Sequence, residues 1–111
     1  MTIRERIRSI QSKLRDLTVT PQMARESLVT LTALLANVLD EERDAELAYK
    51  QVLQAKLAEY DKANRAKIAA ECSPEYARYL EARHTHKMVE QMVMSCKQYM
   101  RSMDEEARLQ R

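Results

Sequence analysis

Apolar side chains recur along the first 17 residues in alternating steps of four and three, at Ile3, Ile7, Ile10, Leu14 and Leu17. This spacing places them on one narrow stripe of an α-helix. Thr2 followed by Glu5 matches a capping box, in which each side chain satisfies a free backbone N–H at the start of a helix. The pattern therefore predicts a helix over residues 3–18.

A break is predicted next, because Thr18 and Val19 are β-branched and the residue before a proline avoids the helical region. Thr20 then suits the N-cap, and Pro21 suits the first helical position. Since no stop signal follows before Cys72, the sequence predicts one helix over 21–72, about 78 Å long at about 1.5 Å per residue. Its apolar stripe contains Leu28, Leu31, Leu35, Val38, Ala45, Tyr49, Val52, Leu53, Leu57, Tyr60 and Ile68.

Ser73 and Pro74 repeat the cap-plus-proline signal and predict a third helix over 74–110. The short break before Pro74 favours a tight αα-hairpin, so the third helix is expected to fold back along the second half of the long one. We expect an all-α fold, a single elongated domain over 1–111 in which two shorter helices lie along a long central helix as a coiled-coil rod. The stripe of the third helix contains His86, Val89, Val93, Cys96, Met100, Met103 and Ala107.

The composition agrees with a helical chain. The 111 residues include no Gly, Trp or Phe and only two prolines, whereas sheets and loop-rich folds need glycine for turns and favour aromatic residues in strands. A rod this thin leaves apolar surface uncovered, so we expect a homo-oligomer. The methionines of the third helix are ordinary core, an oligomer contact or an adaptable docking face for another protein. The contact residues predicted are Met88, Met92, Met100 and Met103.

Charge is uneven along the chain, although the net charge of +2 does not by itself imply a nucleic-acid partner. Residues 1–25 are basic, whereas 26–49 include an acidic belt formed by Asp40, Glu41, Glu42 and Asp44. No apolar run has the roughly 18 residues that a membrane span needs, so we expect no membrane association and a cytoplasmic location. Cys72 and Cys96 are expected to be reduced and mostly buried.

Basic residues are the most useful indication of function. Arg4, Arg8, Arg15 and Arg25 gather near one end of the chain, and further clusters flank the predicted hairpin and continue along the third helix. Such clusters can contact phosphates with little sequence preference when no recognition motif accompanies them, or they can be solvated surface without a function. The predicted nucleic-acid-binding residues are Arg65, Lys67, Arg78, Arg83, Lys97 and Arg101.

Metal and catalytic sites are poorly supported. Glu81 and His84 match half of the ligand pattern of carboxylate-bridged di-iron bundles, but the other half is missing. His84 is predicted to be exposed and His86 to lie on the packed stripe. The cysteines have no catalytic motif around them and no Gly-rich loop is present. We therefore predict no catalytic, cofactor or metal site.

The stretch Ala63-Asn-Arg-Ala-Lys-Ile, with Ser73-Pro-Glu-Tyr76 and Glu81-Ala-Arg83, resembles small helical proteins of tailed bacteriophages that are encoded near early recombination genes. The likeness extends over most of residues 20–105, including Leu31-Thr-Ala-Leu-Leu35 and Lys97 to Arg101. It implies a phage accessory protein that acts in the host cytoplasm. It assigns no residue a role.

Two functions are consistent with these observations. The leading hypothesis is a non-enzymatic, homo-oligomeric accessory protein of phage DNA metabolism that binds nucleic acid or a nucleoprotein complex. The alternative is an interaction protein that inhibits or scaffolds a host or phage protein through the acidic belt and the methionine-rich face. The salt dependence of binding distinguishes the two hypotheses, because phosphate contacts release counterions and make the affinity for DNA fall as the salt concentration rises.

Overall fold

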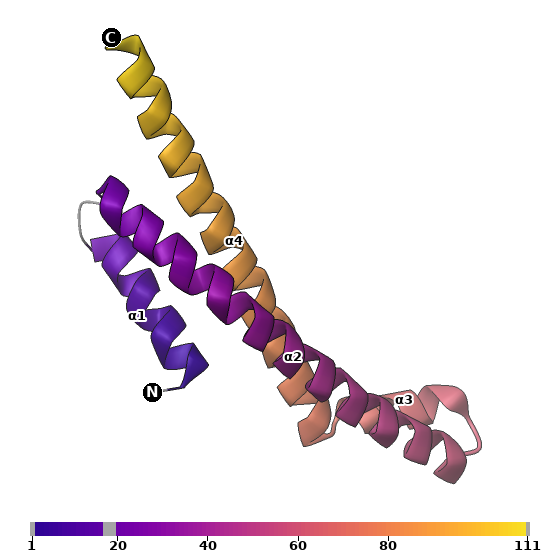
Figure 1. The fold of residues 1–111 in the computed structure, drawn as a ribbon. Helices are drawn as coiled ribbons and strands as arrows, with labels where there is room; N and C mark the ends of the chain where they lie inside the picture. The colour runs from indigo at the N-terminus through magenta and orange to yellow at the C-terminus, as the bar shows by residue number, and fades with distance from the viewer. Residues whose placement is uncertain (1, 17–19, 111) are drawn as a thin grey trace. The chain divides into compact units, whose positions relative to one another are not determined.

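The computed structural model describes residues 2–16 and 20–110 (Figure 1). These residues form four helices and no strand: α1 (Ile3–Asp16), α2 (Pro21–Glu59), α3 (Ala63–Glu71) and α4 (Pro74–Leu109). The all-helical class predicted from the sequence is confirmed, and α2 is a long helix of 39 residues.

The start of α1 has the predicted capping box. The backbone N–H of Glu5 donates to Oγ1 of Thr2 at 3.2 Å, and the backbone N–H of Thr2 donates to Oε2 of Glu5 at 3.3 Å. Each side chain thereby satisfies one of the amides that a helix start leaves without an intrahelical acceptor. The predicted end of this helix at residue 18, and Leu17 on its stripe, lie outside the described residues.

The starts of α2 and α4 are also capped as predicted. Oγ1 of Thr20 accepts the N–H of Met23 at 3.1 Å, and Oγ of Ser73 accepts the N–H of Tyr76 at 3.3 Å. Pro21 and Pro74 are the first residues of their helices, where the missing N–H costs nothing. The short break predicted before Pro74 is confirmed, since α3 ends at Glu71 and α4 begins at Pro74.

The predicted single helix over 21–72 is wrong, because α2 ends at Glu59 and the shorter helix α3 begins at Ala63. Lys62 precedes α3 with extended backbone, at φ −106° and ψ 128°, and makes no side-chain capping bond. The local sequence thus contains no strong stop or start signal here. Three apolar residues placed on the predicted stripe are consequently exposed: Leu57, Tyr60 and Ile68.

Burial explains why the chain leaves the helix at 60–62. Tyr60 and Asp61 are weaker helix formers than alanine, by at most about 0.7 kcal/mol each, so continuing α2 through them gains little. Ala66 and Ala70, four residues apart on one face of α3, are completely buried. Packing of α3 therefore outweighs the small local preference for one continuous helix.

The described chain divides into two compact units, and α2 and α4 contribute to both. Unit 1 comprises residues 1–37 and 87–111, and unit 2 comprises 38–86. In unit 1, α1 lies beside the first part of α2 (Figure 1). The buried core of unit 1 includes Ile7, Ala24, Leu31, Leu34, Val89 and Cys96.

Unit 2 is formed by the second part of α2, by α3 and by the first part of α4. Its core includes the small side chains of Ala45, Ala66 and Ala70 together with Val38. Thr85 is a buried polar residue, and its hydroxyl donates to the carbonyl oxygen of Glu81 at 3.0 Å. A buried hydroxyl that is satisfied in this way carries little penalty.

The two cysteines differ in exposure, and the prediction that both are mostly buried is wrong for Cys72. Cys72 follows the last residue of α3 and is exposed, whereas Cys96 is 4% exposed in the core of unit 1. Burial also raises the pKa of the Cys96 thiol above its ordinary value of 9.0. Both thiols are free.

A thiol-labelling experiment should separate the two cysteines. At neutral pH a disulfide reagent is expected to modify Cys72 promptly and Cys96 slowly, since the thiolate is the reactive form and Cys96 is reached through local opening. Counting modified thiols over time by mass spectrometry measures this, with Cys72→Ser as the matched control. Equal rates at both positions would contradict the burial of Cys96.

Within residues 2–16 and 20–110, no helix has both the length and the apolar character needed to cross a membrane.

Candidate nucleic-acid interface

All six basic residues predicted to contact nucleic acid are exposed, but they fall in different units. Arg65 and Lys67 lie on α3, in the same unit as Arg78 and Arg83 near the start of α4. The remaining two belong to unit 1, where they are four residues apart and therefore share one face of α4. These two are Lys97 and Arg101.

The turn between α3 and α4 connects the helices that carry the four basic residues of unit 2. Cys72, the C-cap that follows α3, has φ −87° and ψ 0°, and the N–H of Ser73 donates to the carbonyl oxygen of Ala70 at 3.1 Å. The hydroxyl of Ser73 donates to that carbonyl as well, at 2.5 Å. Side-chain and main-chain bonds thus close the turn without glycine.

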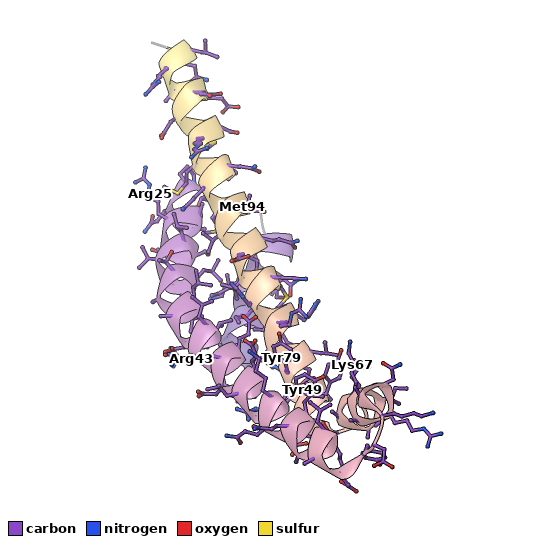
Figure 2. All side chains as sticks on the ribbon, turned by 90° about the vertical axis from the view of Figure 1, so that its right-hand side faces the viewer. Arg25, Arg43, Tyr49, Lys67, Tyr79 and Met94 are labelled. Carbon is purple, nitrogen blue, oxygen red and sulfur yellow. The ribbon has the colours of Figure 1, made fainter. Side chains whose placement is uncertain are left out.

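Three tyrosines line the contact between α2 and α4 in unit 2, and Arg83 lies over one of them. The ring centroid of Tyr49 is 4.8 Å from that of Tyr76 and 5.8 Å from that of Tyr79, with Tyr79 stacked nearly parallel (Figure 2). Cζ of Arg83 is 5.6 Å from the ring centroid of Tyr79, within the range of a cation–π contact. Tyr79 therefore orients Arg83 while the guanidinium stays exposed.

The surroundings of Tyr49 favour the neutral form of its hydroxyl. Burial raises its pKa above the ordinary value of 10.0, and the nearby carboxylate of Glu71 raises it further, with smaller contributions from Tyr76 and Tyr79. The folded state thus binds this proton more tightly than the unfolded chain, so the stabilisation is fully present below pH 10.0 and is lost as the pH rises above it.

Net charge distinguishes the two units more clearly than any single residue. Unit 1 contains 11 basic and 7 acidic side chains, so its net charge is +4, and unit 2 contains 8 basic and 10 acidic ones, so its net charge is −2. The acids of unit 2 include Asp40, Glu41, Glu42 and Asp44, the predicted acidic belt. A polyanion is therefore attracted more strongly to unit 1 than to unit 2.

The basic excess of unit 1 is on exposed side chains. On α1, Arg6, Arg8 and Lys13 are exposed, whereas Ile7 between them is completely buried. Arg25 of α2 is exposed as well (Figure 2). Because burial of the apolar stripe orients α1, Arg6, Arg8 and Lys13 are left on the outside of the unit.

The four methionines predicted as contact residues are all half-buried in unit 1. Met88 and Met92 face α1 across a hollow of about 350 Å³, which Gln11, Leu14, Gln91 and Ser95 also line. Both line this hollow and are half-buried, so their role as core, oligomer contact or docking face stays a prediction. Met100 and Met103 lie further along α4, and their role as oligomer contacts stays a prediction.

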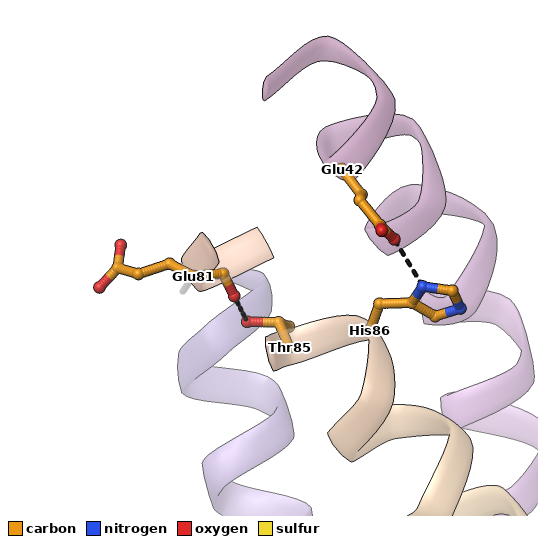
Figure 3. Close-up of polar contacts among 4 residues, drawn as sticks. All are labelled: Glu42, Glu81, Thr85 and His86. Atoms are coloured by element: carbon orange, nitrogen blue, oxygen red, sulfur yellow. Dashed lines mark hydrogen bonds and ion pairs between the residues drawn. The ribbon is translucent and has the colours of Figure 1, made fainter. Parts of the chain in front are cut away.

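Glu42 and His86 form a contact that sequence reasoning missed. Oε2 of Glu42 lies 2.5 Å from Nδ1 of His86, and both side chains are half-buried (Figure 3). His84 is exposed and His86 lies toward the packed side of α4, as predicted. A signal was present in the sequence, because Val38, Glu42 and Ala45 follow the stripe spacing of four and three.

Within the described ranges of the chain, no three or more His, Cys, Asp or Glu side chains are grouped so that they could hold a metal ion. Comparison of the chain with protein-family models, with curated proteins and with solved structures finds no match in any of the three.

Proposed function

We propose that this chain is a non-enzymatic, self-associating helical protein that binds nucleic acid, or a nucleoprotein complex, through exposed basic side chains. The proposal includes the arrangement predicted from the sequence, with two shorter helices folded back along a long one, and a role as a phage accessory protein of DNA metabolism in the host cytoplasm. The observation that carries it is the charge difference between the units, +4 against −2.

The chemistry of such binding is electrostatic. Lysine and arginine side chains neutralise phosphates and release condensed counterions, which accounts for most of the affinity when no bases are read. Arg6, Arg8 and Lys13 on α1 and Arg25 on α2 are exposed and free to approach a phosphate backbone. No recognition-helix motif accompanies them, so we expect little preference for base sequence.

Two variants that each remove four positive charges test this proposal. The first changes Arg6, Arg8, Lys13 and Arg25 of unit 1 to alanine, and the second changes Arg65, Lys67, Arg78 and Arg83 of unit 2 to alanine. The first should weaken binding to single- and double-stranded DNA and flatten the slope of log affinity against log salt by up to about 2.8 to 3.6. The second, on the unit with a net negative charge, should change the slope less.

Fluorescence anisotropy with labelled DNA between about 50 and 200 mM salt measures both slopes. Circular dichroism should hardly differ between the variants, because exposed helix positions tolerate alanine well. A larger loss of DNA affinity in the unit 2 variant would mean that the interface lies on α3 and the start of α4, as predicted from the sequence. If the wild-type protein does not bind DNA at about 50 mM salt, nucleic-acid binding is excluded as its function.

A second candidate function is protein docking, favoured by the hollow between α1 and α4. The methionines that line it have flexible, polarisable side chains suited to binding partners of different shapes. Binding of an apolar helix there would depend little on salt, in contrast to binding of DNA. The salt titration described above therefore distinguishes the two functions.

A further inference from the structure

The last turns of α4 extend past the first turn of α2 within unit 1 (Figures 1 and 2). The core stripe of α4 continues into this extension, at Cys96, Met100, Met103 and Ala107, with steps of four, three and four. Cys96 is buried within the unit, Met100 and Met103 are half-buried, and Ala107 is exposed. The heptad pattern of α4 therefore continues beyond the first turn of α2.

This spacing is that of a coiled-coil seam, in which one helix packs against another along an apolar stripe. Lys97 directly follows Cys96, and Asp104 directly follows Met103, so they occupy equivalent heptad positions beside the seam. Both side chains are exposed. The flank of this seam is thus basic at one end and acidic at the other.

Charge decides which helix can cover the seam and in which direction. In a parallel pair of identical helices, Lys97 would lie at the same height as Lys97 of the second helix, and the acids at 104–106 would lie at the height of the same acids. Like charges would then lie beside one another. In an antiparallel pair, the basic end of each helix lies beside the acidic end of the other. The segment is therefore complementary to itself in the antiparallel orientation, as a two-fold interface requires.

We propose that residues 96–107 of α4 pair antiparallel with the same segment of a second copy of the chain. Met100 packs against Met103 of the second copy, and Ala107 of each chain lies at the height of Cys96 of the other, which stays buried within its own unit. Between these two layers Lys97 faces Asp104 of the second copy. The two-fold symmetry repeats each contact, so two such ion pairs flank the seam.

This inference deepens the proposed function, on which it rests only for the statement that the protein self-associates. A seam of about two heptads is short, so the dimer is expected to dissociate in the micromolar range and not to be obligate. Pairing would place two basic units in one particle, which increases the avidity for a polyanion.

Charge reversals at the flanking pair test the proposal on the full-length chain. Sedimentation equilibrium at about 10 to 200 µM should show a dimer for the wild type. Lys97→Glu alone, or Asp104→Lys alone, places like charges together twice and should weaken dimerisation about 5- to 30-fold. The double variant Lys97→Glu/Asp104→Lys should restore the wild-type dimer.

Mixing the two single variants gives a sharper result. Every flanking pair between one Lys97→Glu chain and one Asp104→Lys chain is an attraction, so the mixture should form heterodimers more readily than either variant forms homodimers. Circular dichroism checks that each variant keeps its helix content. Arg101→Glu alone, which is placed off the flank, is the matched charge-reversal control and should have a smaller effect.

A wild-type monomer over this concentration range overturns the proposal, as does a double variant that associates no better than the single ones. The sedimentation experiment contains no nucleic acid, so its outcome is independent of the binding titration. A monomer that binds DNA would contradict this inference and leave the nucleic-acid function standing. A dimer that does not bind DNA would support this inference and contradict the nucleic-acid function.

Discussion

Replacing Ile7 with aspartate is expected to detach α1 from unit 1. Ile7 is completely buried, and removing a large core side chain costs about 2 to 5 kcal/mol before the cost of burying a charge is added. A helix of 14 residues is marginal alone in water, so α1 should lose its helical structure when it no longer packs. The variant should show a lower melting temperature and less helix by circular dichroism.

Arg8→Asp is the matched control, because it introduces the same side chain at the adjacent exposed position. It should leave the melting temperature almost unchanged, since most exposed substitutions lie within about 0.5 kcal/mol. Equal melting temperatures for the wild type and Ile7→Asp would mean that α1 is not docked in solution. The affinity for DNA should fall in both variants, so the melting temperature is the measurement that separates the folding effect of Ile7→Asp from the charge effect of Arg8→Asp.

The second large effect is expected at the buried alanines of α3. Ala66→Leu and Ala70→Leu each insert a larger side chain where α3 packs closely in unit 2, and overpacking of this kind costs about 1 to 3 kcal/mol. Because the packing of α3 opposes only a weak preference for continuing α2, the expected response is separation of α3 from the unit. Limited proteolysis near residues 60–62 should then become faster.

Ala63→Leu tests whether the effect depends on burial, because Ala63 begins the same helix and is exposed. The melting temperature and the proteolysis rate of the Ala63→Leu variant should match those of the wild type. If all three leucine variants behave alike, the buried face of α3 does not contribute to the stability of unit 2, and the break after Glu59 needs another explanation.

The candidate interface could be predicted in part. Exposure of the six basic residues follows from their positions beside the apolar stripes, and Lys97 and Arg101 share a face because they are four residues apart. Their division between a basic and an acidic unit could not be predicted, because it depends on where along α2 and α4 the tertiary contacts place the boundary between the two units. That division moves the expected phosphate contacts from α3 toward α1 and the first part of α2.

The sequence by itself determined where α1, α2 and α4 begin. Thr2, Thr20 and Ser73 each cap a helix through a bond that spans three residues, and such local signals act without knowledge of the rest of the chain. The all-helical class follows for the same reason, because side-chain periodicity and the absence of glycine are local properties.

Only the tertiary structure decided the end of α2 and the partners of the buried groups. Lys62 makes no capping bond, and we attribute the break there to the complete burial of Ala66 and Ala70 within unit 2. The contact between Glu42 and His86 likewise joins residues on two helices, and the stacking of Tyr49 on Tyr79 does so as well. Helix propensities differ by a few tenths of a kcal/mol per residue, whereas burial of a side chain contributes several times more. The propensities therefore cannot predict contacts that depend on packing.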